Sequence, residues 1–313
     1  MRNRREAVLS VLDASKPQEY VPAAFFMHFA PQYHRGRAAV DKHLEFFRYT
    51  GMDFVKIQFE FPYPRHPEIQ QPEDWARMPL YGKEFYRPQL EVVEGLVREI
   101  GDDALVILTL YSPFMLAGEA VGAETVEAHI RENPQATKRG IGIIAESLMI
   151  FVQECIRLGV DGFYHSTQGG EASRLGGTGL FEECVKPSDL LLMNEIDRSC
   201  VFNILHICDY AAGYDDLTPF LDYPGHVVNC SLHLGDRTLK PQEVSDLFGR
   251  PFMGGLERKG IIATGAPADV AQAAAAALLQ RSDRFILGAD CTVPAGADWA
   301  NLRAAITTAH NYH

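Results

Sequence analysis

One histidine and two cysteines are the residues in this sequence best suited to chemistry. His206 and Cys208 lie two positions apart in the middle of the chain, and Cys291 lies near its end. One imidazole and two thiolates suit a soft or borderline divalent ion, of which Zn²⁺ is the commonest. Three protein ligands leave a fourth position open for a substrate, as in catalytic rather than structural zinc sites. The three residues therefore predict zinc-assisted chemistry.

Both parts of this motif follow apolar runs that are predicted as β-strands, over residues 201–207 and 285–290. Residues at positions i and i+2 of a strand point to the same side, so His206 and Cys208 can bind one ion. A β/α barrel gathers its active site at the carboxyl ends of strands that are far apart in sequence. The placement of the motif is therefore typical of a barrel enzyme.

A packing role is the alternative for these cysteines. A free cysteine is most often a small buried hydrophobic residue, and the H-x-C pattern is short. The six cysteines of the chain lack the spacing of a disulfide framework, which indicates reduced thiols in a cytoplasmic protein. We assign the other four to packing: Cys155, Cys184, Cys200 and Cys230.

The composition is that of an ordinary globular protein, with 47% hydrophobic and 22% charged residues. A net charge of −12 argues against nucleic-acid binding, which usually needs a basic face, but it permits a local basic pocket for an anionic substrate. No apolar run reaches the roughly 18 residues of a membrane span, and the N-terminal stretch lacks the apolar region of a signal peptide. We expect a cytoplasmic enzyme that has no membrane partner.

Short β-rich runs alternate with longer helical patterns along the chain, which indicates βα units and a parallel sheet. Eight strands are predicted, over residues 24–29, 54–59, 105–110, 162–167, 201–207, 227–232, 252–256 and 285–290. Helical patterns cover residues 88–100, 138–158, 241–248 and 267–280. The sequence carries neither a dinucleotide-binding glycine motif nor a P-loop. We therefore predict an α/β fold, a single (β/α)8 TIM barrel domain over residues 1–313.

Several other polar residues fall in or just after predicted strands, where a barrel can place its active site. Glu171 and Glu60 are candidate catalytic residues, and either carboxylate could occupy the fourth metal position until a substrate displaces it. His28, Gln168 and His233 are candidate substrate-binding residues. The structural alternative is a solvated or helix-capping carboxylate, or a histidine satisfied within the core.

For three further polar residues the sequence favours a structural role over a functional one. Arg35 and Arg37 follow the first predicted strand and could hold an anionic tail such as a sulfonate or carboxylate, although a surface loop is the simpler interpretation. His165 lies inside a predicted strand, where a core histidine is the commoner outcome.

Five short motifs, all in the second half of the chain, carry a family resemblance. They read L-G-V-D-G at residues 158–162, L-H-I-C at 205–208, F-M-G-G-L at 252–256, G-A-P-A-D-V at 265–270 and F-I-L-G-A-D-C-T-V-P at 285–294. Together they resemble the uroporphyrinogen decarboxylase superfamily, over nearly the whole chain and most strongly after Gly159. That resemblance also implies a barrel.

The decarboxylase branch of this superfamily fits the chain poorly. Decarboxylases carry arginines in an F-M-R-Q-A-G-R-Y segment, whereas residues 26–33 read F-M-H-F-A-P-Q-Y, with His28 in place of the first arginine. The aspartate that decarboxylases carry at the end of the second strand is not evident in Gln-Phe-Glu at residues 58–60. Because a porphyrinogen needs several bidentate arginine partners, we do not expect porphyrinogen decarboxylation.

The chain is more similar to the methylcobamide:coenzyme M methyltransferase branch, whose zinc is held by an H-x-C…C motif. The resemblance implies that His206, Cys208 and Cys291 bind Zn²⁺, and that a methyl group passes between a small thiol and a corrinoid carried by a partner protein. Metal binding deprotonates a thiol whose pKa is otherwise near 8.5. The chain departs from this branch at Asp209 and Asp290, where glycine or a small residue is usual, which concerns the substrate more than the metal.

Two alternatives to thiol methylation stay open. A metal-free, decarboxylase-like enzyme acting on a small non-porphyrin acid would keep its turnover after Cys208 and Cys291 are replaced. A catalytically silent barrel that sequesters a thiol or a metal would bind its ligand tightly and form no product. The resemblance is also compatible with a homodimer.

Overall fold

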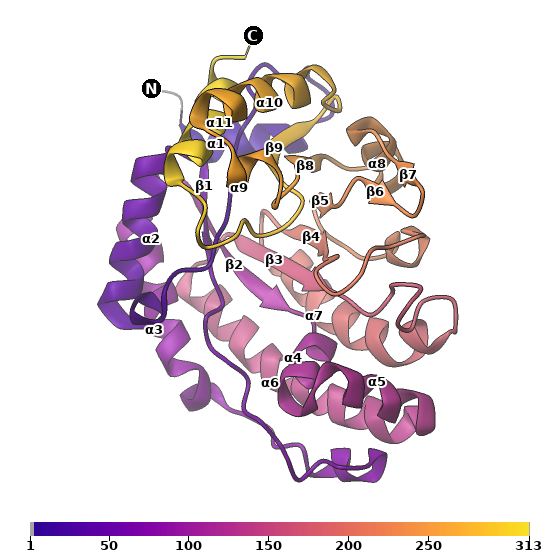
Figure 1. The fold of residues 1–313 in the computed structure, drawn as a ribbon. Coiled ribbons are helices and arrows are strands. Elements are labelled where there is room, and N and C mark those ends of the chain that lie inside the picture. The colour runs from indigo at the N-terminus through magenta and orange to yellow at the C-terminus, as the bar shows by residue number, and fades with distance from the viewer. Residues whose placement is uncertain (1–2, 313) are drawn as a thin grey trace.

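The computed structural model describes residues 3–312 and contains a curled parallel sheet of seven strands (Figure 1). The strand order is β1-β2-β3-β4-β5-β8-β9. These strands are β1 (Phe54–Ile57), β2 (Leu105–Tyr111), β3 (Gly162–Thr167), β4 (Ile204–Ile207), β5 (Val227–Cys230), β8 (Phe252–Leu256) and β9 (Phe285–Ala289). A separate antiparallel hairpin consists of β6 (His233–Leu234) and β7 (Arg237–Thr238). The fold is therefore α/β, as the alternating pattern predicts.

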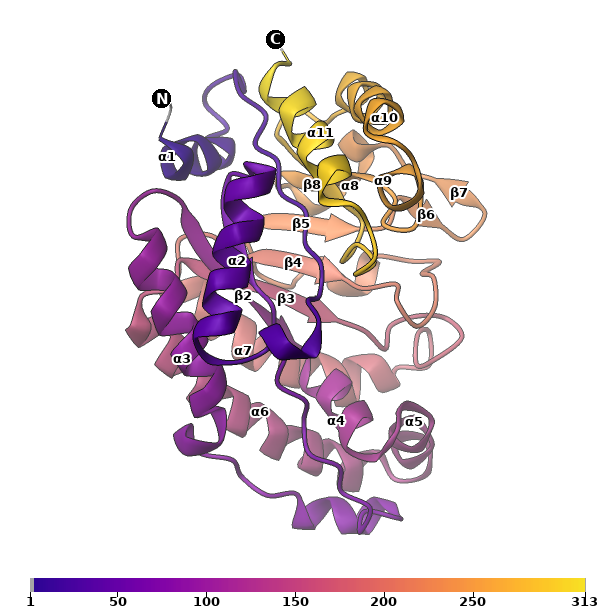
Figure 2. The ribbon, with the colours of Figure 1, turned by 60° about the vertical axis from the view of Figure 1, so that its left-hand side comes forward.

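Helices lie outside the curled sheet, as the two ribbon views show (Figure 1 and Figure 2). They are α1 (Arg4–Leu9), α2 (Gly36–Thr50), α3 (Lys83–Ile100), α4 (Pro113–Val121), α5 (Ala123–Glu132), α6 (Pro134–Leu158), α7 (Lys186–Ser199), α8 (Pro241–Phe248), α9 (Ile261–Thr264), α10 (Pro267–Leu279) and α11 (Trp299–His310). Proline stands at the first position of α4, α6, α8 and α10, where its missing N–H costs no helical hydrogen bond. Among the described residues, no helix has the length and apolar character of a membrane span.

The sequence predicts most strands well, and β3 and β8 have the expected bounds. The largest shortening is at β4, which is expected from residue 201 and begins at Ile204. The backbone N–H groups of Val201 and Phe202 both donate to the carbonyl of Asp161 instead of joining the sheet ladder. These two contacts with the residue before β3 therefore delay the start of the strand by three residues without moving its end.

The segment predicted as the first strand, residues 24–29, is not a regular strand. Isolated parallel bridges join Ala23 to β9 and Met27 to the segment after β9, and the carbonyl of Ala23 accepts the N–H of Asp53. The Asp53 carboxylate accepts the N–H of Ala23, and the Gln58 amide donates to the carbonyl of Met27. Because side chains take these backbone groups, a continuous ladder with β1 does not form. The sheet thus has seven regular strands where eight are predicted.

Buried side chains on both faces of β3 separate the interior of the sheet from its helical cover. Tyr164 and Ser166 line a cavity inside the curled sheet. His165 alternates with them, and its imidazole Nε2 lies 3.5 Å from the Asp189 carboxylate of α7. His165 is therefore a core residue on the helix-facing side, in agreement with the simpler interpretation of its position.

Candidate metal centre

His206, Cys208 and Cys291 come together at the carboxyl ends of two strands. His206 lies in β4, Cys208 follows its last residue, and Cys291 lies two residues beyond the end of β9. All three are buried, and one candidate ligand atom from each lies within 4.8 Å of the others. The N–H of Cys208 donates to the carbonyl of Thr167 over 3.0 Å, which holds it at the end of β3. The sheet thereby brings His206 and Cys208 close to Cys291, which lies 83 positions after Cys208.

The geometry of this cluster fits a tetrahedral metal ion. The sulfurs of Cys208 and Cys291 lie 4.0 Å apart, close to the roughly 3.8 Å expected for two thiolates bound tetrahedrally at about 2.3 Å. Both ring nitrogens of His206 are buried and have no hydrogen-bond partner among the described residues. Leaving a buried polar group unpaired is costly, and a metal ligand bond removes that cost. We therefore find that the residues present fit zinc.

The two thiols differ in acidity, although both are buried. Their hydrogen bond lowers the pKa of Cys208 well below its ordinary value, despite the opposing effect of burial. The same hydrogen bond, together with burial, raises the pKa of Cys291. One thiolate is therefore favoured in the pair before any cation binds. A site with this charge is prepared for a divalent ion, because metal ligands must be deprotonated.

A chain of polar side chains leads from the Cys208 sulfur to a buried carboxylate. The amide of Gln168 donates to the sulfur over 3.3 Å, and Arg174 donates to the oxygen of the same amide over 3.2 Å. Arg174 also pairs with the carboxylates of Glu171 and Glu127. Gln168, a candidate substrate-binding residue from the sequence, thus lies next to the cluster and lines the cavity. Such outer contacts orient the ligands of a metal site.

Glu171 is the buried carboxylate at the far end of this series of polar side chains, and it does not line the cavity. Its carboxylate accepts the N–H of Gly169 over 2.7 Å and contacts Arg174 at 3.2 Å. Burial raises the pKa of Glu171, while the charge of Arg174 acts in the opposite direction. In this arrangement Glu171 holds Arg174, which in turn contacts Gln168 next to Cys208.

Tyr164 supports the imidazole of His206 and is a residue that the sequence did not single out. The two rings stack with centroids 4.8 Å apart. The Tyr164 hydroxyl donates to Asn229 over 2.5 Å, and the Asn229 amide donates to carbonyls of both β8 and β9. Tyr164 is therefore fixed at both ends, and its ring sets the plane of His206. Its inward position in β3 is visible only once the register of the sheet is known.

Asp209 and Asp290, the two residues that depart from the family motif, both contact Arg258. Arg258 contacts Asp209 at 2.5 Å and Asp290 at 3.7 Å, and its backbone N–H donates to Asp290. Asp209 directly follows Cys208, and Asp290 directly precedes Cys291. Burial raises the pKa of Asp290, and the neighbouring Arg258 opposes that effect. Arg258 therefore ties the two ligand-bearing loops together, which the sequence alone does not reveal.

A cavity of about 690 Å³ opens above the cluster, and all three of its residues line it. The cavity wall is basic although the protein is acidic overall. Its charged side chains are Lys56, Arg65, Arg174, Arg258 and Lys259 on the cationic side and Glu119 on the acidic side. Its volume is that of a pocket for a small molecule or part of a cofactor. Local positive charge favours an anionic ligand.

His28 and Glu60 form a second polar group at the edge of this cavity. The His28 Nδ1 lies 3.0 Å from both oxygens of Glu60. Burial acts to raise the pKa of Glu60, but the hydrogen bond and charge of His28 outweigh it and lower that pKa. His28 lines both the main cavity and an adjoining one of about 460 Å³, whereas Glu60 lines only the adjoining one. The structure thus brings His28 to the cluster side and keeps Glu60 behind it.

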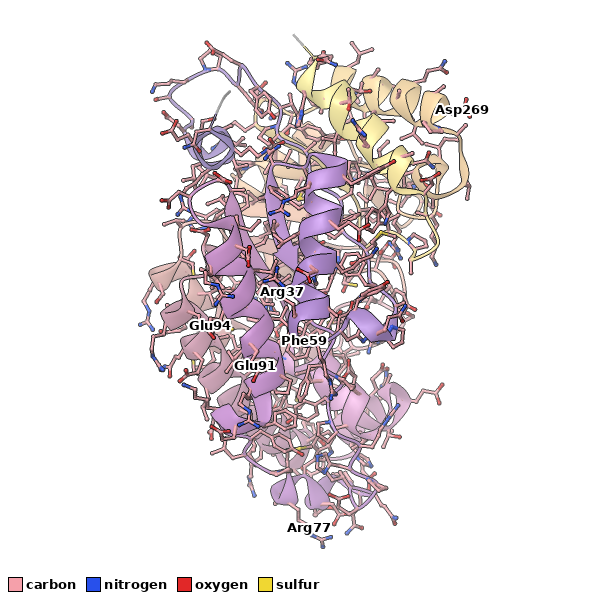
Figure 3. All side chains as sticks on the ribbon, turned by 90° about the vertical axis from the view of Figure 1, so that its left-hand side faces the viewer. Arg37, Phe59, Arg77, Glu91, Glu94 and Asp269 are labelled. Carbon is pink, nitrogen blue, oxygen red and sulfur yellow. The ribbon has the colours of Figure 1, made fainter. Side chains whose placement is uncertain are left out.

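Three other residues considered from the sequence lie away from the main cavity. His233 belongs to the β6–β7 hairpin and pairs with the exposed Glu257 at 2.8 Å. Arg37 lies on α2 (Figure 3) and pairs with Glu99. Arg35 is exposed, and its guanidinium lies over the ring of Phe61. None of the three lines the cavity that contains the metal-ligand candidates.

Comparison with known proteins identifies the family of this barrel-like fold. Residues 47–312 match the uroporphyrinogen decarboxylase (URO-D) family, and the chain belongs to it. No curated protein matches the sequence in a direct search.

Two solved structures share the fold at low sequence identity. A methyltransferase from Methanosarcina mazei is 13% identical, with a TM-score of 0.77 over 99% of this chain and 98% of the other. A B12-independent methionine synthase from Shewanella sp. W3-18-1 is 12% identical, with a TM-score of 0.60 over 92% of this chain and 97% of the other. At such identities the likeness establishes the fold.

Proposed function

We propose that this protein is a zinc-dependent methyltransferase that transfers a methyl group between a donor and a small thiol. The observation that carries the proposal is the buried cluster of His206, Cys208 and Cys291, whose ligand atoms lie within 4.8 Å of one another beside a cavity of about 690 Å³. Methyltransferases among the structural neighbours support the same reaction class. Zinc bound there would lower the pKa of an incoming thiol and supply its thiolate for attack on the methyl carbon.

The side chains around the cluster keep the site neutral and ordered before the thiol arrives. His206, Cys208 and Cys291 would hold the ion, and the two thiolates would balance the charge of Zn²⁺. Gln168 donates a hydrogen bond to the Cys208 sulfur and fixes its direction. Tyr164 stacks on His206 and holds the imidazole plane. Preorganised ligands of this kind avoid reorganisation during the reaction.

The remaining polar residues receive supporting roles in this proposal. His28 contacts the substrate from the edge of the cavity, and Glu60 orients it through their 3.0 Å contacts. Glu171 is the alternative carboxylate for the fourth metal position, which it reaches only by leaving Arg174. His233 contacts substrate only if the hairpin closes over the opening. These roles complete the candidate site.

A corrinoid protein is the methyl donor that we propose, in keeping with the family branch that the H-x-C…C motif resembles. The methyl-bearing face of a corrinoid on a partner protein would approach through the open side of the cavity. One structural neighbour is named as a B12-independent enzyme, so a donor without a corrinoid is the outcome to distinguish. We further propose that residues 1–313 form one barrel domain, in which residues 24–29 take the place of the eighth strand. We also propose that the protein is a cytoplasmic homodimer.

The direct test is methyl transfer from methylcobalamin to a panel of small thiols by the zinc-loaded protein. We expect turnover with the wild type, none above background with Cys208→Ser/Cys291→Ser, and normal turnover with Cys200→Ser. Cys200 is a matched control because it is buried like the ligand cysteines but lies at the end of α7. Equal turnover by the double variant would contradict the proposal and favour metal-free chemistry.

A further inference from the structure

His28 and Glu60 form a carboxylate–imidazole pair in which one ring nitrogen is left without a protein partner. The Nδ1 atom of His28 lies 3.0 Å from both oxygens of Glu60. Among the described residues, the Nε2 atom has no hydrogen bond. The side chain of His28 is 42% exposed, whereas that of Glu60 is 9% exposed. The pair therefore joins a buried carboxylate to an imidazole that a ligand can reach.

The charge of Glu60 determines which ring nitrogen of His28 carries the proton. Burial acts to raise the pKa of Glu60, but its contacts with His28, His34 and the N–H of Phe29 outweigh burial and lower that pKa. Because an ionised carboxylate only accepts hydrogen bonds, Nδ1 of His28 must be the donor. In the neutral imidazole Nε2 then keeps its lone pair. His28 is thus held in the tautomer that a carboxylate sets for a histidine base.

His28 lies where two cavities meet. It lines the cavity of about 690 Å³ that contains the metal-ligand candidates, and also the adjoining cavity of about 460 Å³. Glu60 lines only the adjoining cavity. Since Nε2 is on the ring edge opposite Nδ1, it is turned away from Glu60 and is available to the main cavity. A base in this place can take a proton from a ligand on one side and release it to water on the other.

The other groups around His28 are less suited to accept a proton. The Nε2 atom of His34 donates to the carbonyl of Phe29 over 2.8 Å, and His34 does not line the main cavity. Burial lowers the pKa of Lys56 to about 7, which makes it the competing acceptor, but its Nζ lies against the rings of Phe26 and Tyr164. The remaining titratable or charged groups that line a cavity with His28 are Glu60, Arg65, Tyr111 and Glu119.

We propose that His28 is the general base of the proposed methyl transfer and takes the proton of the substrate thiol on its Nε2 atom. This inference rests on the proposed function. The S–H bond breaks, the sulfur keeps the electron pair, and the proton forms an N–H bond at Nε2. Glu60 is a positioning residue that stabilises the imidazolium. Once the methylated product leaves, the proton passes to water in the adjoining cavity and the imidazole is neutral again. In the reverse direction Nε2 returns the proton to the sulfur.

The experiment counts the protons that are released when a thiol binds to the zinc-loaded protein. Titration calorimetry with 2-mercaptoethanol at pH 7.5, in buffers of different ionisation enthalpy, gives this number. An ordinary thiol is protonated at this pH, so its proton must go either to the protein or to the buffer. We expect the wild type to release well under one proton, because His28 keeps it. His28→Asn should release about one, since its amide can still donate to Glu60 but cannot take a proton.

The pH dependence of thiol affinity provides a second readout. For each proton released on binding, affinity rises by about tenfold per pH unit. Affinity should therefore change little between pH 7 and 8 in the wild type and rise by about tenfold in His28→Asn. Glu60→Gln keeps an acceptor for Nδ1 but removes the charge that stabilises the imidazolium. It should release more protons than the wild type and show an intermediate slope.

His34 provides a matched control, because it too faces Glu60. Its Nε2 atom lies 3.8 Å from the Glu60 carboxylate, and it lines the adjoining cavity but not the main one. The amide of His34→Gln can still donate to the carbonyl of Phe29. This variant should release as few protons as the wild type. Release of a full proton by His34→Gln would contradict the assignment to His28.

Release of about one proton by the wild type would overturn the proposal whatever the variants do. Proton retention in His28→Asn would overturn it too, and its loss in Lys56→Met would then identify the lysine as the acceptor. Should His28→Asn fail to fold, Glu60→Gln decides, since wild-type proton release and slope in that variant are incompatible with the pair.

Thiol binding itself separates this inference from the proposed function. If the zinc-loaded wild type binds no thiol, the proposed function fails and the base fails with it. If a thiol binds and the full proton appears in the buffer, the proposed function stands and only the role of His28 is lost.

Discussion

The side of the cavity formed by β4 and β9 carries three ligand candidates within 4.8 Å of one another, whereas Lys56 on the side formed by β1 has no acidic partner among the residues that the structure describes. On the first side both thiols and Gln168 form a connected set, and Arg258 pairs with the carboxylates of Asp209 and Asp290 beside the two cysteines. On the second side the rings of Phe26 and Tyr164 lie against the charge. The difference is that the first side offers a set of candidate metal ligands, whereas the second side offers a single buried cation.

The largest effect should come from the metal side. His206→Ala removes a ligand rather than one of its supports, so zinc affinity should fall by more than the roughly 10- to 100-fold typical of lost outer contacts. Competition titration with a chelator of known zinc affinity measures the change. His226→Ala is the control, because His226 accepts a hydrogen bond from Asn203 far from the cluster. Wild-type zinc affinity in His206→Ala would remove the distinction between the two sides.

A smaller but still large effect should follow from Arg258→Met. Asp209 and Asp290 would lose their shared partner, and breaking a buried ion pair typically costs about 3–5 kcal/mol. Both carboxylates are partly exposed, so we expect about 2–3 kcal/mol of lost unfolding free energy, measured by urea denaturation of the metal-free protein.

The triple variant Asp209→Asn/Arg258→Met/Asp290→Asn tests whether the loss in Arg258→Met is electrostatic. Since no carboxylate then lacks a partner, it should recover part of the stability. If it is less stable than the single variant, Arg258 acts by packing and not by joining the two loops.

Lys56 should affect how the unfolding free energy depends on pH. In the metal-free protein the pKa of Lys56 is lowered to about 7, so between that pH and about 10 the unfolded chain binds the extra proton. The unfolding free energy contributed by this group therefore rises with pH, by about 1.4 kcal/mol per unit for one proton. Denaturation of the wild type and of Lys56→Met at pH 7, 8 and 9 should show that difference in slope. Parallel curves would mean that Lys56 keeps an ordinary acidity.

The smallest effect should come from the link between the two sides. Tyr164→Phe keeps the ring that contacts both Lys56 and His206 but leaves the Asn229 oxygen without its 2.5 Å donor. An unsatisfied buried acceptor costs about 1–3 kcal/mol of unfolding free energy. Zinc affinity should change little in this variant, which thermal and chelator titrations together establish. A loss of zinc comparable to that in His206→Ala would show that the hydroxyl and not the ring positions the imidazole.

The metal side of the cavity could be predicted from sequence because its signals are local. The H-x-C spacing puts His206 and Cys208 on one side of a strand, and both cysteine loops follow recognisable apolar runs. The resemblance to a known family then adds Cys291. For the same reason β3, β8 and the helices that begin at Pro241 and Pro267 are largely as predicted, whereas Pro88, predicted as a helix start, lies inside α3 (Lys83–Ile100).

The other side could not be predicted, because it depends on register and on distant partners. Residues 54–59 are buried on both faces of the sheet, so the sequence does not tell which face Lys56 occupies. The meeting of Asp209 and Asp290 on Arg258 joins three loops that no spacing rule connects. The prediction of a regular strand over residues 24–29 is wrong because the side chains of Asp53 and Gln58 take backbone groups that a continuous ladder with β1 would need.

The central claim is that the β4 and β9 side binds a metal ion, and zinc content tests it most directly. Elemental analysis of the wild type and of Cys208→Ser/Cys291→Ser, both purified without chelator and then offered zinc, should give about one zinc per wild-type chain and almost none in the variant. A wild type that takes up no zinc, or a double variant that keeps a full equivalent, would contradict the account.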